Sequence, residues 1–300
     1  MSGSAAVRDA AASAALAGER TSRGADFFEL TKPRITFLVL VTAAVGFALG
    51  ADGRFEAVPF LLMIAGTALL SGGVGALNQH AERDADARMD RTRYRPLPAG
   101  RLLPSEALAF GLAISGAGLV LLFAAGWLAG LLGLLTAASY LLLYTPLKRV
   151  TSLCTVVGAV PGALPPVIGW AAARGELEAG AWALFAVLFL WQLPHFLALA
   201  WLYREDYARG GFPMLTVSDT DGASTGRQAL LYAAALLPAS LLAGLLTSAG
   251  NGYLWAATAL GVLFAAAAAR FAWNRTASAA RTLFLFSILY LPALFGALVI

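Results

Sequence analysis

Residues 107–147 read ALAFGLAISGAGLVLLFAAGWLAGLLGLLTAASYLLLYTPL and contain no charged side chain. A bilayer interior of about 30 Å is crossed by roughly 20 apolar residues in an α-helix. A charge-free stretch of twice that length must therefore fold back as two helices, and Gly126 offers a turn near its middle. Residues 228–269 are also free of charge and predict a second such pair, with its turn at residues 250–252.

The whole chain has the composition of a membrane protein. Of its 300 residues, 59% are hydrophobic and 13% are charged, whereas soluble domains carry about 25% charged residues. Because hydrocarbon offers the backbone no hydrogen-bond partners, apolar spans must be helical. We predict an all-α integral membrane protein with nine transmembrane helices, at residues 35–51, 58–78, 105–125, 127–145, 151–171, 180–203, 228–248, 252–270 and 281–299.

Basic residues predict the orientation of these spans. Of the 21 Lys and Arg residues, all but Arg54 and Arg174 fall in the amino-terminal segment or in loops after even-numbered spans. Positive charge is retained on the cytoplasmic side, so we expect a cytoplasmic amino terminus and a carboxyl terminus on the opposite side of a bacterial plasma membrane. The basic charge is therefore a topology signal, and we do not expect nucleic-acid binding.

The amino-terminal segment differs in composition from the rest of the chain. Residues 1–26 are rich in Ala, Gly and Ser and have no apolar core, which predicts a disordered cytoplasmic tail and not a signal peptide. Residues 27–300 then form a single polytopic membrane domain. The chain has one cysteine, so it can build neither a disulfide nor a thiolate metal site of its own.

Acidic residues gather after the second span, in the sequence NQHAERDADARMDRTRYRPLPAGRL at residues 78–102. Asn78, Glu82 and Asp86 are four residues apart and would lie on one helical face. Carboxylates at this spacing repel each other unless a cation lies between them, and Mg²⁺ accepts such oxygen ligands together with phosphate oxygens. The cluster therefore indicates a magnesium site for a diphosphate substrate; the alternative is a solvated flank of the span.

Four blocks of the sequence resemble the UbiA superfamily of intramembrane prenyltransferases, and most closely its haem O synthase branch. The blocks are LTKPRI at 30–35, the acidic motif with its continuation MDRTRYRPL at 89–97, YTPLKRVTSLCTVVGAVPGALPPVIGW at 144–170, and WQLPHFLALAWLYREDYARGGFPML at 191–215. The resemblance covers residues 28–300. It implies a helical bundle around a central cavity that opens to the cytoplasmic side.

The implied reaction transfers a farnesyl group from farnesyl diphosphate to the 2-vinyl group of haem B, giving haem O and diphosphate. Under the resemblance, Asn78, Glu82 and Asp86 hold Mg²⁺, although Glu82 stands where much of the superfamily has aspartate. The superfamily's second motif has two aspartates four apart, whereas this sequence has Leu202 and Asp206. Asp206, helped by Glu205, is the remaining candidate for catalysis there, which puts a second metal ion in doubt.

Basic and aromatic residues near these motifs are candidates for binding the substrates. Lys148 suits a phosphate group, and Tyr144 lies on the same helical face; positive-inside flanking is the alternative explanation for Lys148 and Arg149. The full set expected to bind diphosphate is Lys32, Arg91, Tyr144, Lys148 and Arg149. His195 lies deep in an apolar span and is either a haem iron ligand or a hydrogen-bonded structural residue.

Two other functions remain open at this level. A UbiA-type enzyme that prenylates an aromatic or quinone precursor would share the acidic motif and the fold. A small-molecule transporter would also be a helical bundle, but transporters usually place polar sites near the bilayer midplane, whereas these acids gather at one face. The expected partners are the two substrates, the lipid bilayer, and a haem A synthase or terminal oxidase assembly that receives the product.

Overall fold

The computed structural model describes residues 22–299, and within that range the regular structure is entirely helical. The helices in chain order are α2 (Arg23–Leu30), α3 (Pro33–Ala51), α4 (Ala57–Asp86), α5 (Pro104–Ala125), α6 (Trp127–Ala138), the π-helix η1 (Ser139–Tyr144), α7 (Thr145–Leu147), α8 (Cys154–Ala163), α9 (Pro165–Arg174), α10 (Ala179–Leu202), α11 (Arg204–Gly210), α12 (Leu215–Ser218), α13 (Ala223–Leu246), α14 (Asn251–Asn274) and α15 (Ala277–Val299).

The described residues contain nine helical segments long and apolar enough to cross a bilayer, which confirms the predicted number of spans. The second span differs most from its prediction, because α4 continues as one helix to Asp86. The fourth span is composed of α6, η1 and α7, and the fifth bends at Leu164, where α8 ends and Pro165 starts α9. Proline at the first position of a helix is compatible with helical geometry but interrupts the hydrogen bonds of the preceding turn.

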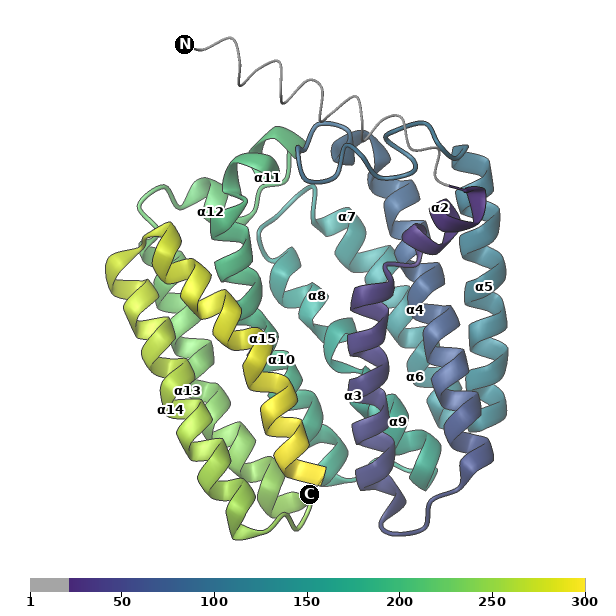
Figure 1. Ribbon diagram of the computed structural model, residues 1–300, viewed down its shortest axis with the longest axis vertical. Helices are drawn as coiled ribbons and strands as arrows, with labels where there is room; N and C mark the ends of the chain where they lie inside the picture. The colour runs from purple at the N-terminus through teal and green to yellow at the C-terminus, as the bar shows by residue number, and fades with distance from the viewer. Residues whose placement is uncertain (1–21, 300) are drawn as a thin grey trace.

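The spans pack in two groups (Figure 1). One group contains α3 to α9, and the other contains α10, α13, α14 and α15. In the second group each helix contacts the next one along the chain, and α15 also contacts α10. Glycines allow the closest approaches within the first group: a Cβ atom at Gly46 would collide with the carbonyl of Pro166, and one at Gly169 with that of Ala43. Small residues bring the backbones of α3 and α9 together in this way because no side chain separates them.

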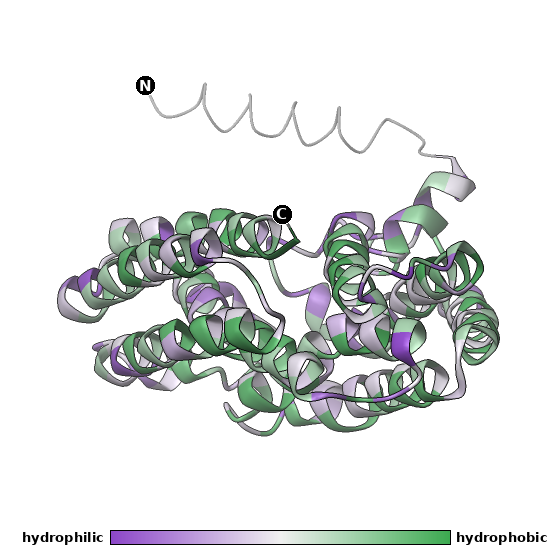
Figure 2. Ribbon diagram, turned by 90° about the horizontal axis from the view of Figure 1, so that it is seen from below, coloured by the Kyte–Doolittle hydropathy of each residue, from purple (hydrophilic) through white to green (hydrophobic). Residues whose placement is uncertain are grey.

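The two ends of the bundle differ in polarity. We call the end that carries α2, the loop of residues 87–103, α7, α11 and α12 the polar end; it is at the top of Figure 1, and α15 ends at the bottom. The spans themselves are mainly hydrophobic in Figure 2. Exposed tryptophans mark both boundaries, with Trp273 at the polar end and Trp127, Trp182 and Trp255 at the other. Such amphipathic rings favour the bilayer interface.

The boundary of the predicted amino-terminal tail is partly wrong. Residues 1–21 lie outside the described residues, but α2 begins at Arg23 and is capped by the Ser22 hydroxyl, which accepts a hydrogen bond from the N–H of Ala25. Residues 22–26 are therefore ordered and belong to the folded domain. The sequence signal for this helix was weak because α2 has eight residues, fewer than an isolated helix needs to be stable.

Candidate functional site

The last turns of α4 bring three oxygen-bearing side chains into the interior of the polar end. Asn78, Glu82 and Asp86 are only 3%, 2% and 1% exposed, respectively. They share a face because α4 runs unbroken past the apolar span and because positions four apart lie one above another on a helix. The structure therefore groups these three side chains on one buried face, as their spacing predicts, whereas Asp84 and Asp90 of the same motif are exposed.

Each of these three side chains contacts a different basic residue. The Lys32 Nζ donates to Asn78 Oδ1 at 2.8 Å, the Lys148 Nζ to Glu82 Oε2 at 2.9 Å, and the Arg95 Nη1 to Asp86 Oδ2 at 2.8 Å. The cations come from the α2–α3 elbow, the segment after α7 and the loop after α4. Buried carboxylates are tolerated when they are paired, so these contacts explain how the acids can be adjacent.

The two lysines differ electrostatically. Burial and the positive charge of Arg95 lower the pKa of Lys32 to about 7. Burial acts in the same direction on Lys148, but attraction to Glu82 outweighs it and raises the pKa of Lys148 above its ordinary value. Lys148 is therefore a permanent cation at neutral pH.

Arg95 is a site residue that sequence reasoning did not single out. It lies nine positions after Asp86 in an irregular loop, where no periodicity predicts its direction. Arg95 and Lys148 balance the two carboxylates, and Lys32, whose pKa is about 7, adds a third positive charge when it is protonated. This excess of positive charge favours an anionic ligand.

The π-helix η1 connects the fourth span to the site. The N–H and the hydroxyl of Thr145 both donate to the Tyr140 carbonyl, the hydroxyl at 2.9 Å. That hydroxyl therefore accepts the hydrogen bond from Asn78 Nδ2, at 3.3 Å. Lysine can only donate, so Lys32 must contact the amide oxygen of Asn78. Two partners thus specify the same amide orientation, and π-turns are frequent at functional sites.

The aromatic and basic neighbours of Lys148 are placed unequally. The Lys148 Nζ lies 4.5 Å from the ring centre of Phe212 and 5.9 Å from that of Tyr144. Tyr144 is thus beside the site, as its spacing predicted. Arg149 instead donates to the backbone carbonyl of Ala81 at 2.5 Å and is exposed. The structure does not bring the guanidinium of Arg149 to the acidic face of α4.

Asp206 holds the loop that follows α4. Its carboxylate accepts hydrogen bonds from the N–H groups of Asp90 at 3.0 Å and Arg91 at 3.3 Å, and it also pairs with Arg209. Burial would raise the pKa of Asp206, but these donors outweigh it and hold the pKa below its ordinary value. The Arg91 guanidinium lies 5.3 Å from the ring centre of Tyr203.

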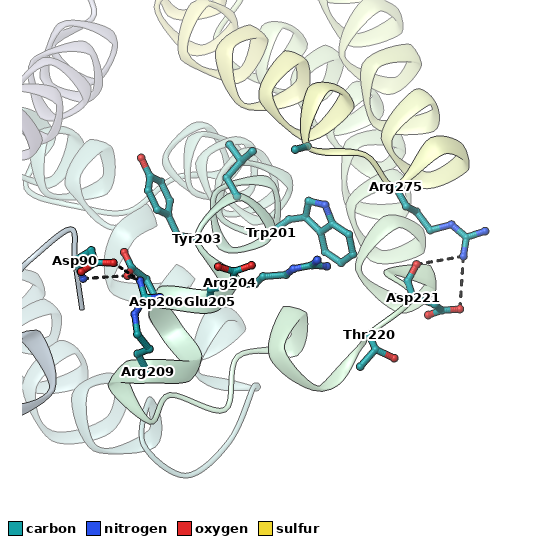
Figure 3. A pocket seen from close by; sticks show the side chains of 12 residues that line it. Asp90, Trp201, Tyr203, Arg204, Glu205, Asp206, Arg209, Thr220, Asp221 and Arg275 are labelled. Carbon is teal, nitrogen blue, oxygen red and sulfur yellow. Dashed lines mark hydrogen bonds and ion pairs between the residues drawn. The ribbon is translucent and has the colours of Figure 1, made fainter. Parts of the chain in front are cut away.

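A cleft of about 610 Å³ opens beside this carboxylate at the polar end (Figure 3). Asp90, Asp206 and Arg209 lie at one side of the cleft, and Asp221 with Arg275 at the other. Arg204 lies between them and stacks on the ring of Trp201 at 4.8 Å. Leu202 also lines the cleft. It occupies the position where an aspartate would complete a second acidic motif, so an apolar side chain faces the cleft there.

His195 lies within α10 and faces α15. Its Nδ1 is 2.7 Å from the Ser287 hydroxyl, and its ring stacks between Trp191 and Phe284. The Ser287 hydroxyl donates its one hydrogen to the Phe284 carbonyl at 2.6 Å, so it must accept from Nδ1–H. This network leaves the lone pair of a neutral His195 on Nε2, the form that binds metals.

Comparison with known proteins decides the family. The model of the UbiA prenyltransferase family matches residues 39–290. The chain belongs to the UbiA prenyltransferase family. It is 48% identical to a protohaem IX farnesyltransferase from Solibacter usitatus (strain Ellin6076), over 90% of this chain and 96% of that protein. It is 45% identical to a protohaem IX farnesyltransferase from Koribacter versatilis (strain Ellin345), over 92% of each.

Solved structures share the UbiA fold at low sequence identity. A digeranylgeranylglyceryl phosphate synthase has a TM-score of 0.77 at 17% identity, over 91% of this chain and 96% of that one. A UbiA homologue from Archaeoglobus fulgidus bound to DMAPP and Mg²⁺ has a TM-score of 0.64 at 16% identity, over 91% and 99%. These matches and the nine helical spans confirm the predicted all-α UbiA-type membrane fold.

The oxygen atoms of Asn78, Glu82 and Asp86 are suitable ligands for a magnesium ion. Within residues 22–299, no group of three or more His, Cys, Asp or Glu side chains could hold a metal, so a metal at the acidic face of α4 would need the amide oxygen of Asn78. The donors are then all oxygens, as Mg²⁺ prefers. In addition, Asp86 Oδ1 is buried without a hydrogen-bond partner among the described residues, and a metal ion or an ordered water would satisfy such an atom.

Proposed function

We propose that this UbiA prenyltransferase transfers a farnesyl group from farnesyl diphosphate to the 2-vinyl group of haem B, giving haem O and diphosphate. The observation that carries the proposal is the buried row of Asn78, Glu82 and Asp86, in which each side chain contacts its own cation. The names of the relatives, at 41–48% identity over about nine-tenths of the chain, support the two substrates.

Asn78, Glu82 and Asp86 would hold Mg²⁺. A bound Mg²⁺ supplies positive charge that stabilises the departing diphosphate. Lys148 and Lys32 add to this charge from the protein, with Arg95 beside them. In the structure these cations contact the oxygens of Asn78, Glu82 and Asp86, so binding of Mg²⁺ and diphosphate would require the cations to shift from these oxygens to the diphosphate. Arg91 lies in the same loop as Arg95, after α4. Tyr144 lies beside Lys148, with its ring centre 5.9 Å from Nζ, whereas Arg149 joins the segment after α7 to α4.

The chemistry proposed is an electrophilic alkylation. The bond between C1 of the farnesyl group and the diphosphate oxygen breaks, and the diphosphate retains the electron pair. The π-electrons of the haem vinyl group form the new carbon–carbon bond, and water then adds to the resulting cation and releases a proton. Apolar walls formed by the helices would protect the farnesyl cation from early hydrolysis.

We propose His195 as the residue that orients haem B. The Ser287 hydrogen bond leaves Nε2 able to bind the haem iron. We also propose that the polar end faces the cytoplasm of a bacterial cell, because Arg54 and Arg174 are the basic residues assigned to the other side.

Expression in cells that lack their own haem O synthase, followed by extraction of the haems, tests the function. The mass of the product reports both substrates, and a prenylated aromatic or quinone in place of haem O would overturn the proposal. Asp86→Ala should abolish product formation while the protein still inserts and elutes as wild type does. Near-normal turnover by this variant would remove the metal assignment.

A further inference from the structure

Lys32 reaches the site from a backbone conformation that L-residues avoid. Its φ and ψ are 51° and 58°, in the left-handed region. Such conformations persist where the surroundings enforce them, and they are frequent at functional sites. In Lys32 the conformation forms the elbow between α2 and α3 and directs Nζ toward Asn78 Oδ1. The question is what enforces it.

The elbow is fixed on one side by α4. Leu30 is fully buried, and its carbonyl accepts a hydrogen bond from Gln79 Nε2 at 2.9 Å. A Cβ atom at Gly75 would lie 3.4 Å from the Leu30 carbonyl oxygen and 3.5 Å from Lys32 Cδ, so the elbow packs directly over this glycine. These contacts place the elbow one helical turn from Asn78. The start of α2 is held on α5, where Arg23 pairs with Glu106 and the ring centres of Phe27 and Phe110 are 4.9 Å apart.

Arg101 fixes α2 from the other side. Its Nε contacts Asp26 Oδ1 at 2.7 Å, its Nη2 contacts Glu29 Oε2 at 2.6 Å, and its Nη1 donates to the Tyr94 carbonyl at 2.9 Å. One guanidinium therefore joins two turns of α2 to the loop that also carries Arg91 and Arg95. An eight-residue helix is too short to be stable by itself, so α2 depends on such contacts.

We propose that Arg101 is a positioning residue that clamps α2 and thereby holds Lys32 against the diphosphate-binding site. This inference rests on the proposed function, because it takes farnesyl diphosphate as the ligand of Lys32. Arg101 makes no hydrogen bond or ion pair with Asn78, Glu82 or Asp86 among the described contacts, so it acts through the elbow. Its loss leaves α2 attached to α5 through Arg23 and Phe27, but it removes the contact between the loop and the end of α2 next to the elbow, and Lys32 can then leave the left-handed conformation.

Equilibrium binding of farnesyl diphosphate and steady-state kinetics, both in lipid nanodiscs, test the clamp. Arg101→Ala should weaken binding of farnesyl diphosphate and raise KM on the order of tenfold, with a smaller change in kcat. A change of this size corresponds to the loss of about one charge-assisted hydrogen bond. Arg174→Ala is the matched control: Arg174 also pairs with two acids, Asp52 and Glu178, and is similarly exposed, but it lies at the opposite end. It should bind as wild type does.

A double-mutant cycle separates the clamp from general destabilisation. If Arg101 acts through Lys32, Arg101→Ala should cause no further loss of binding in a Lys32→Met background. Additive losses, or wild-type binding by Arg101→Ala, would overturn the inference. If Arg101→Ala does not fold, Arg101→Lys carries the same test, because a single ammonium cannot reproduce the two-carboxylate contact. Wild-type protein that fails to bind farnesyl diphosphate would instead refute the proposed function.

Discussion

The ion pair between Lys148 and Glu82 predicts two inactive variants that differ in stability. The Lys148 Nζ and Glu82 Oε2 are 2.9 Å apart, with side-chain exposures of 12% and 3%. At an effective dielectric constant of about 20, charges at this distance attract by roughly 6 kcal/mol, and desolvation of the two ions offsets much of that. Replacement of one partner loses the attraction but leaves the other ion desolvated.

Lys148→Met should therefore destabilise the protein by about 3–5 kcal/mol, the usual cost of an unpaired buried charge. The double variant Glu82→Gln with Lys148→Met removes both charges and should recover most of this stability. Neither variant should form haem O, because the diphosphate loses Lys148 in both. The pattern expected is thus one stable inactive protein and one unstable inactive protein.

Unfolding in mixed micelles, followed by helical circular dichroism without Mg²⁺ or substrate, measures these differences. Arg174→Met is the control, since its partners Asp52 and Glu178 have side-chain exposures of 76% and 38% and surface pairs add little stability. A Lys148→Met protein as stable as wild type would show that water reaches Glu82 and would refute the buried pair. If the double variant is as unstable as Lys148→Met, the loss of stability comes from the missing packing contacts of the Lys148 side chain and not from the unpaired charge of Glu82.

Three further outcomes follow from the site. Thr145→Val should raise the Mg²⁺ concentration needed for thermal stabilisation and for turnover, because the Asn78 amide can then rotate; Thr145→Ser should retain both. Asp206→Asn should reduce turnover by loosening the loop after α4. Because the pKa of Asp206 is lowered in the folded protein, its charged form stabilises the fold above about pH 4. The free energy of unfolding, measured as a function of pH, should lose this contribution as the pH falls further. His195→Ala should abolish the iron-ligand signature in the optical spectrum of bound haem, and Ser287→Ala should weaken it.

The sequence alone predicted the spans and the acidic face of α4. Both depend on local regularities: a bilayer requires about 20 apolar residues per helix, and residues four apart align on a helix whatever it packs against. For the same reason Tyr144 and Lys148 could be assigned to one face. The predicted tail includes residues 22–26, which the structure places at the start of α2, because α2 is held by contacts with residues far along the chain, namely Arg101, Glu106 and Phe110.

The partners of these groups were decided by tertiary structure. The spacing of residues along the chain does not pair Arg95 with Asp86. Nor does it show that the Asp206 carboxylate accepts hydrogen bonds from the backbone N–H groups of residues 90 and 91. The π-helix before Thr145 and the Ser287 contact of His195 were equally invisible to periodicity. The spacing of residues along a helix specifies which face a side chain occupies. Its contact partner on another helix depends on how helices that are distant in the sequence pack together. The sequence therefore determined which side chains share the acidic face of α4, and the packing of the helices determined which basic groups meet them.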